Sequence, residues 1–160
     1  MDILAIVIIV IRYLFTDKFN SRIAKLKNTY HYGRRDYLMS QSESIFLKTL
    51  FDVVGDDYHV FPQVHLSAIL DEKKVKGQNW KAAFRHINGK SVDYVICDKR
   101  SIKPLLAVEL DDWSHDAQDR RDRDAEVERI LQGAGLPIVR FDKRKGLNKE
   151  DIKKRIFEAI

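Results

Sequence analysis

The stretch Pro104-Leu-Leu-Ala-Val-Glu-Leu-Asp-Asp-Trp-Ser-His115 decides the fold, because an apolar strand runs directly into three carboxylates and a histidine. Upstream, Ser91-Val-Asp-Tyr-Val-Ile-Cys97 is a second apolar strand that carries one acid, Asp93. Acids at the edge of buried strands are costly to desolvate unless they are paired or bind a cation. Their grouping predicts a divalent-metal site and therefore an enzyme that cuts phosphate esters.

The spacing of the acids supports this prediction. Side chains alternate along a strand, so Glu109 and Asp111 project from the same face. A hairpin centred on Ser101 sets Asp93 opposite Glu109, with Cβ atoms about 4.5–5.5 Å apart. Two bare carboxylates would repel at that distance, and a Mg²⁺ or Mn²⁺ ion between them removes the conflict. We therefore expect Asp93 and Glu109 to hold a metal that activates water and polarises the scissile phosphate.

Flanking residues have two interpretations each. His115 lies where it can relay a proton, or it is an exposed loop residue before a helix. Trp113 either stacks on a base or packs at the rim of the core. Arg120 and Arg123 belong to a solvated, ion-paired helix face, from which one arginine can reach a phosphate. Arg140, inside an apolar strand, is explained by pairing with a site acid or a phosphate, or by an edge position.

The remaining pattern predicts a mixed α/β fold. Ser40-Gln-Ser-Glu43 has the spacing of a capping box at the start of a helix, and Glu43 either caps that helix or reaches the metal site. Pro62 in the strand 58–64 indicates an edge or a bulge. The order αβ(α)ββαβα indicates a central mixed sheet with helices on both faces. Further elements are expected at 79–87, 92–97, 105–111, 116–132, 137–141 and 149–160.

We divide the chain into an apolar segment (1–15), a basic linker (16–38) and a folded domain (39–160). The segment from Ile3 to Ile11 is apolar, but at about 13 apolar residues it is shorter than the roughly 20 of a membrane span. A membrane anchor, a signal peptide and a buried element compete. The following basic residues favour an anchor at the cytoplasmic face of the inner membrane, with the rest in the cytoplasm.

Charge and cysteine content limit the alternatives. The net charge of +5 comes from the N-terminal arm, because residues 36–160 hold 22 basic and 22 acidic residues. A basic arm suits an anionic membrane as well as a nucleic acid. The single cysteine, Cys97, excludes an intrachain disulfide and a cysteine-rich zinc site.

Three motifs together resemble the PD-(D/E)XK, restriction-endonuclease-like superfamily. They read Val92-Asp93-Tyr94, then Ala107-Val-Glu-Leu-Asp-Asp-Trp-Ser-His115, then Arg123-Asp124 followed by Ile130 through Arg140. The similarity is greatest to the very-short-patch-repair-like branch and to an uncharacterised bacterial domain family related to it. It covers residues 39–160 and implies a restriction-endonuclease-like sheet.

The resemblance implies roles for individual residues. Asp93 and Glu109 would hold the metal, His115 would carry protons, and Asp124 would support the site. One departure concerns Asp111, which stands where the superfamily usually has a lysine, although the short-patch-repair-like branch also lacks it. We include Asp111 among the candidate catalytic residues.

Lys90, near the start of the Asp93 strand, is either a relocated motif lysine or a solvated strand-end residue. Because the usual motif lysine is absent, its role in stabilising the transition state is assigned to no residue of this sequence.

The leading hypothesis is a Mg²⁺- or Mn²⁺-dependent nuclease that hydrolyses double-stranded DNA. The alternative is a catalytically inactive nuclease fold that binds nucleic acid or a protein partner. A membrane-associated scaffold with only surface ion pairs fits less well, because such pairs rarely need alternating positions in an apolar strand.

Overall fold

The computed structural model describes residues 12–13, 30–111 and 118–160. The chain divides into two units, Met1–Leu38 and Met39–Ile160. In the first unit, residues 30–38 have no regular secondary structure. The predicted anchor at 1–15 lies outside the described residues except for Arg12 and Tyr13. No helix within the described ranges has the length and apolar character needed to cross a membrane.

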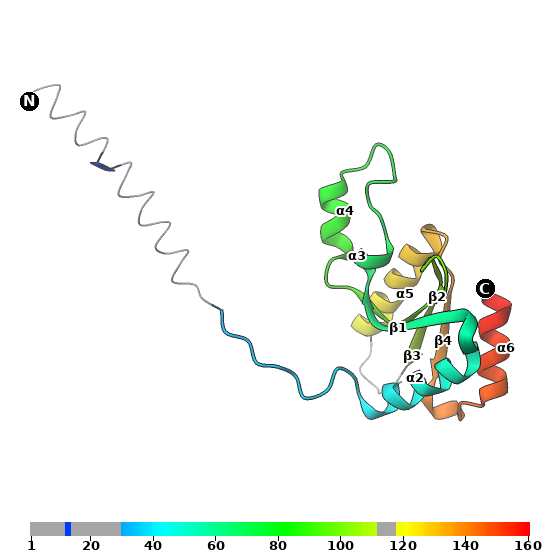
Figure 1. Cartoon of the computed structure of the whole chain (residues 1–160). Helices are drawn as coiled ribbons and strands as arrows, with labels where there is room; N and C mark the ends of the chain where they lie inside the picture. Colours follow the sequence, from blue (N-terminus) through cyan, green and yellow to red (C-terminus); the bar gives the residue numbers. More distant parts are fainter. Residues whose placement is uncertain (1–11, 14–29, 112–117) are drawn as a thin grey trace, which may run out of the picture. The chain divides into compact units, whose positions relative to one another are not determined.

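The second unit is a mixed α/β domain, as its sequence predicts (Figure 1). Its elements in chain order are α2 (Gln41–Val54), the 3₁₀ turn η1 (Gly55–Asp57), β1 (Tyr58–His65), α3 (Leu66–Ile69), α4 (Trp80–Ile87), β2 (Ser91–Asp98), β3 (Pro104–Asp111), α5 (Gln118–Gly133), β4 (Ile138–Asp142), the 3₁₀ turn η2 (Lys143–Lys145) and α6 (Lys149–Ala159).

Four strands form one sheet in the order β1-β2-β3-β4. β1 pairs with β2 and β2 with β3 in antiparallel fashion, whereas β3 and β4 run parallel. β1 and β4 are therefore the edge strands among the described residues. The predicted edge position of Pro62 is confirmed, and the backbone next to it is irregular because Gln63 has a φ of 52°.

The predicted hairpin register between β2 and β3 is confirmed. Tyr94 pairs with Val108, Val95 with Ala107 and Ile96 with Leu106. A bulge at Ile96/Cys97 shifts the pairing by one residue on the side toward the turn. Because the shift lies beyond the three regular pairs, it does not disturb the end of the hairpin that carries the acids.

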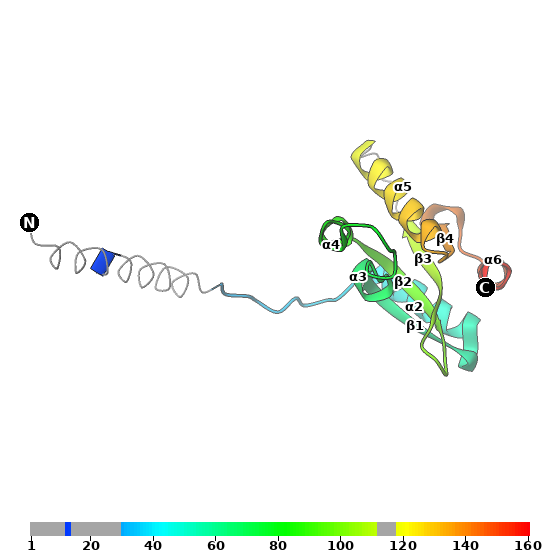
Figure 2. The same ribbon diagram turned by 90° about the horizontal axis from the view of Figure 1, so that it is seen from above.

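Helices lie on both sides of the sheet (Figure 2), and each face packs against its own apolar layer. One layer, with α2 and α6, is centred on Phe46, Leu50, Tyr94, Ile96, Leu106, Val108, Phe141, Ile152 and Ile156. The other, with α3, α4 and α5, contains Leu66, Ile87, Val92, Val95, Cys97, Ala107, Val127 and Leu131. The burial of Cys97 raises the pKa of its thiol, so this cysteine is expected to be unreactive.

The first turn of α2 is closed by its own capping box and is joined to the sheet by a hydrogen bond from Tyr94. The predicted capping box is present: the Glu43 amide donates to Ser40 Oγ (3.3 Å) and the Ser40 amide donates to Glu43 Oε2 (2.6 Å). The buried Tyr94 hydroxyl donates to the Glu43 carbonyl oxygen (2.8 Å). These bonds hold Glu43 against the β2 strand at the end where Asp93 lies.

We expect Tyr94→Phe to lower the free energy of unfolding by about 1 kcal/mol, because a part-buried carbonyl loses its donor. Urea denaturation measures the change. Tyr58→Phe is the matched control, since no hydrogen bond of its hydroxyl is seen among the described residues, and it should change stability by less than about 0.5 kcal/mol. Equal effects of the two changes would show that the Tyr94 hydroxyl does not tie α2 to the sheet.

Candidate active site

Asp93 and Glu109 come together at one end of the sheet. Both side chains lie on the α5 side, the face that Val95 and Ala107 share with them by strand alternation. The two carboxyl groups lie within hydrogen-bonding range, and each shifts the pKa of the other. The main-chain amide of Leu110 donates to Asp93 Oδ2 at 2.9 Å. The structure therefore brings together the two acids that the sequence predicts as metal ligands.

The contact occurs just beyond the last regular pair of the hairpin, Tyr94 with Val108. In a continued ladder, Asp93 would lie directly opposite Glu109. The Leu110 amide is instead satisfied by a side-chain carboxylate, so Asp93 is held rigidly by main chain. A fixed side-chain orientation is what a preorganised site requires.

The two carboxyl groups share a proton at neutral pH. Burial raises the pKa of Glu109 to about 9, and the adjacent negative charge of Asp93 adds to the effect. Burial also raises the pKa of Asp93, while the Leu110 amide acts in the opposite direction. From the sequence, a cation is expected to relieve the repulsion between the two acids. In the structure, the proton relieves it.

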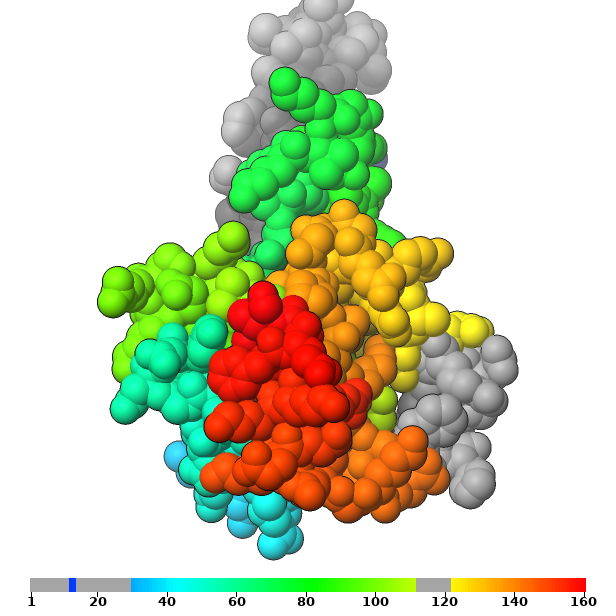
Figure 3. All heavy atoms as spheres, turned by 90° about the vertical axis from the view of Figure 1, so that its right-hand side faces the viewer, coloured from blue at the N-terminus to red at the C-terminus, as the bar shows by residue number. Residues whose placement is uncertain are grey.

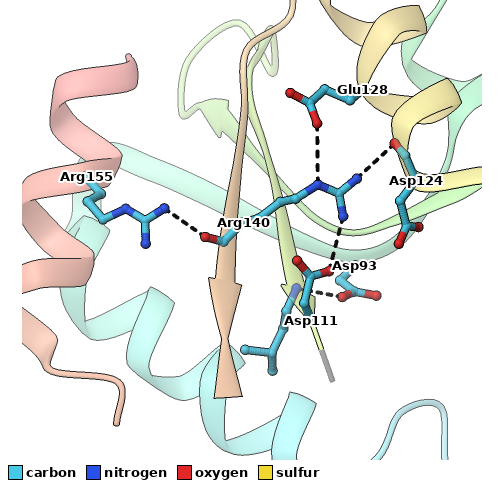
Figure 4. Close-up of polar contacts among 7 residues, drawn as sticks. Asp93, Asp111, Asp124, Glu128, Arg140 and Arg155 are labelled. Atoms are coloured by element: carbon cyan, nitrogen blue, oxygen red, sulfur yellow. Dashed lines mark hydrogen bonds and ion pairs between the residues drawn. The ribbon is translucent and has the colours of Figure 1, made fainter. Parts of the chain in front are cut away.

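A second cluster lies beside this pair and is centred on Arg140 of β4 (Figure 4). Its guanidinium donates to Asp111 Oδ1 (3.1 Å) and to the Asp124 carbonyl oxygen (3.1 Å), and it lies 3.8 Å from Glu128 Oε2. Arg155 of α6 donates to the Arg140 carbonyl oxygen at 2.8 Å. Arg140 therefore links α5 to the end of β3 from an edge strand.

The Arg140 contacts clarify its predicted role. Pairing with a site acid and an edge position both hold for it, while contact with a nucleic acid stays a prediction. Burial raises the pKa of Asp111, and the positive charge of Arg140 opposes that rise. Asp111 is thus fixed beside Glu109 on the same face of β3.

The predicted capping role of Glu43 is confirmed, while its predicted reach to a metal site stays a prediction. It caps α2, and its other oxygen accepts from Gln63 Nε2 at 3.2 Å. Its negative charge also raises the pKa of Asp93, which indicates proximity to the carboxyl pair. Burial acts to raise the pKa of Glu43, but its bonds to Ser40, the charge of Lys143 and the bond from Gln63 hold it below its usual value.

Lys143 is a site residue that the sequence analysis missed. It is half-buried at the start of η2, and its positive charge acts to lower the pKa of both Glu43 and Asp93. Its place follows from the parallel pairing of β3 with β4: Lys143 follows β4 directly, and the carboxyl ends of both strands meet at the edge where Asp111 pairs with Asp142.

The other predicted residues are less well placed or lie outside the described residues. Trp113 and His115 are in the gap at 112–117, and the side chain of Arg120 is also not described. Arg123 and Asp124 are exposed on α5, and the negative charge of Asp124 raises the pKa of Asp111.

Lys90 does not reach the carboxyl pair as a relocated lysine. Its ammonium donates to the His86 carbonyl oxygen (2.5 Å) and pairs with Glu126 at 3.2 Å. Nor is it a solvated strand-end residue, because only 18% of its side chain is exposed. It ties the end of α4 to α5.

Within the described ranges, no group of three or more histidine, cysteine, aspartate and glutamate side chains is arranged to hold a metal ion. Asp93 and Glu109 remain a pair of adjacent carboxyl groups.

Comparison with known proteins places the chain in a family without assigning an activity. The model of the family described as "Protein of unknown function (DUF2726)" matches residues 35–160. The chain therefore belongs to this family. Neither the curated proteins nor the solved structures contain a significant match.

The raised pKa of Glu109 predicts a pH-dependent stability in the presence of a metal chelator. Between the ordinary glutamate pKa of 4.5 and about 9, the folded chain keeps a proton that the unfolded chain has lost. Stability therefore falls as pH rises through this window. In Glu109→Gln the amide donates to Asp93 without titrating, so the variant should exceed the wild type at pH 8 by about 1–2 kcal/mol.

Urea denaturation at several pH values measures this difference. Glu158→Gln, on the exposed side of α6, is the control and should keep the wild-type slope. If Glu109→Gln also keeps the wild-type slope, the shared proton is refuted.

A double-mutant cycle tests the Arg140 cluster. Arg140→Gln leaves the half-buried Asp111 without its cation and should cost about 1–3 kcal/mol, whereas Asp111→Asn should remove much of that penalty. The coupling energy should fall in the range of about 0.5–3 kcal/mol for contacting residues. Arg140→Gln combined with Asp52→Asn on α2 should be additive. Additivity in both cycles would mean that the Asp111–Arg140 pair contributes nothing.

Proposed function

We propose that this DUF2726 family member is a divalent-metal-dependent nuclease that hydrolyses phosphodiester bonds in DNA, and that its domain has the restriction-endonuclease-like fold. The observation that carries the proposal is the adjacent pair of Asp93 and Glu109. Two acids held on neighbouring strands, one of them with a pKa near 9, are an unfavourable arrangement for a merely structural domain. Perturbed carboxyl groups of this kind are characteristic of functional sites.

The donor set suits a hard cation. Ionised carboxylates are acceptors with two oxygens each, and Mg²⁺ typically binds one or two carboxylates while its other positions take water and substrate phosphate. Asp93 and Glu109 would hold the ion, and it would replace the proton that they share. When bound, the metal supplies Lewis-acid polarisation of the phosphate and a more acidic water.

Other residues set the position and charge around this pair. Arg140 fixes Asp111 beside Glu109 through the 3.1 Å contact, so the third acid keeps one orientation. The Leu110 amide holds Asp93 against movement when substrate binds. Lys143 contributes a positive charge at the same edge of the sheet, where it favours an approaching phosphate.

The placement of Lys143 bears on the one departure from the superfamily motif. Asp111 takes the position of the usual lysine, and it is neutralised by Arg140 rather than presented to substrate. In our proposal Lys143, at the carboxyl end of the parallel neighbour β4, supplies the cation that the motif position lacks. The antiparallel β2–β3 pair, with Asp93 on one strand and Glu109 on the other, supports the restriction-endonuclease-like assignment.

Cleavage of plasmid and mismatched duplex DNA with Mg²⁺ or Mn²⁺ tests the proposed activity. Asp93→Asn and Glu109→Gln should each reduce the cleavage rate by more than roughly 10- to 100-fold, the loss typical of changes to residues that only support a metal's direct ligands. Lys143→Gln should lose activity because the positive charge that favours the substrate phosphate is removed, but it should retain its affinity for the metal. Asp57→Asn, an exposed acid in η1, is the matched control and should cut at the wild-type rate.

Equal cutting by wild type and Asp93→Asn would assign the activity to a contaminant and contradict the proposal. DNA binding without turnover under all metal conditions would instead identify the inactive nucleic-acid-binding module.

A further inference from the structure

Residues 73–90, which we call the basic protrusion, hold five lysines, one arginine and no acidic residue. Because residues 36–160 contain equal numbers of basic and acidic residues, the rest of the domain is net negative. The protrusion is thus a concentrated cationic region on an otherwise acidic domain. Five of its six cations are exposed: Lys73, Lys74, Lys76, Lys81 and Arg85.

The exposed cations of the protrusion are available to a ligand. No ion pair between them and any acid is found among the described residues. Only the last cation, Lys90, is paired. A surface that kept its lysines merely for solubility would not require the neighbouring aromatic rings described next.

Helix α4 extends the apolar face of the protrusion beyond the core. Trp80, Phe84 and Ile87 recur at helical spacing on one face. Ile87 is buried in the α5-side layer, whereas Trp80 is 45% and Phe84 40% exposed. Figures 1 and 3 show the segment around α4, in green, projecting from the body of the domain. Two aromatic side chains are therefore presented outside the core.

The Trp80 ring is flanked by two ammonium groups. Lys73 Nζ lies 5.3 Å and Lys81 Nζ 5.5 Å from the ring centroid. An exposed ring with cations on its borders offers a stacking surface for a base together with charges for the adjoining phosphates.

The base of the protrusion is anchored near the candidate active site. His86 Nε2 contacts Glu126 Oε1 at 2.7 Å and Lys90 Nζ contacts Glu126 Oε2 at 3.2 Å, so the end of α4 is fixed to α5. The chain then enters β2 at Ser91, the strand that carries Asp93. A nucleic-acid strand bound along the protrusion would therefore run toward the carboxyl pair of Asp93 and Glu109.

We propose that the basic protrusion binds single-stranded DNA, with Trp80 stacking on an unpaired base and the surrounding lysines contacting phosphates. The choice of DNA rests on the proposed nuclease function. The inference narrows the substrate to DNA with a single-stranded segment next to the cleavage site.

Unpaired DNA fits the exposed Trp80 ring and the lysines of the protrusion better than a DNA duplex or a membrane surface does. Phosphate contacts alone suit a duplex equally well, but bases in a duplex are already stacked on each other and cannot cover an exposed ring. An anionic bilayer attracts lysines, but an interfacial helix inserts its whole apolar face into the bilayer. The eight-residue α4 buries the Ile87 end of its face in the protein.

The test is fluorescence anisotropy of a labelled single-stranded oligonucleotide with the full chain in EDTA, which separates binding from cleavage. Lys76→Glu/Lys81→Glu should weaken binding at least 10-fold and reduce the slope of log Kd against log salt by about 0.7 per lost contact. Lys48→Glu/Lys153→Glu makes the same charge change on α2 and α6, on the other side of the sheet, and should have little effect.

Trp80 provides an independent variant series. Trp80→Leu should weaken binding roughly 5- to 100-fold, the range expected for one lost base stack, and Trp80→Phe should retain most of the affinity. Thermal unfolding checks that each variant is folded.

Three outcomes would overturn the inference: equal losses in the two charge-reversal variants, equal affinity of the wild type for duplex and single strand, or stronger binding to anionic phosphatidylserine vesicles. The binding test does not depend on cleavage. If the protrusion binds single-stranded DNA but the separate cleavage assay finds no activity, the proposed nuclease function is refuted and the binding inference stands.

Discussion

The close approach of the carboxyl groups of Asp93 and Glu109 is the constraint on which the proposed chemistry depends. Two acids on neighbouring strands can lie this close only when a proton or a cation stands between them. Burial drives the pKa of Glu109 to about 9, so the proton is retained at neutral pH. In the proposed function, a divalent ion takes the place of this proton.

Other elements of the domain hold that end of the sheet in place. Tyr94 joins β2 to the first turn of α2, and Arg140 joins β4 and α5 to Asp111. Separate apolar layers on the two faces fix the sheet between them. The site is consequently built on strands and their immediate hydrogen bonds, which position side chains more accurately than loops do.

Much of the candidate site follows from local rules. Alternation places Glu109 and Asp111 on one face, and a turn centred on Ser101 sets Asp93 opposite Glu109. The bulge at Ile96/Cys97 did not spoil this register because it lies on the turn side of the regular pairs. The capping box of Ser40 and Glu43 was equally predictable, since both of its hydrogen bonds are formed within one helical turn.

Features that depend on tertiary structure were not predicted. The electrostatic coupling of Lys143 to Asp93 depends on the parallel pairing of β3 with β4, which no local pattern specifies. The charge excess of the basic protrusion is contiguous in the sequence but disappears when charges are summed over residues 36–160, and only the fold shows that this segment projects from the domain. Lys90 shows the same limit, since its partner Glu126 comes from a distant helix.

The most direct measurement is anomalous X-ray scattering from crystals soaked in Mn²⁺. The account predicts one strong peak between the carboxyl groups of Asp93 and Glu109, at about 2.0–2.3 Å from an oxygen of each, the range for small hard cations. A crystal that shows the two carboxyl groups still hydrogen-bonded to each other at saturating Mn²⁺, or that binds the ion only elsewhere, would contradict it.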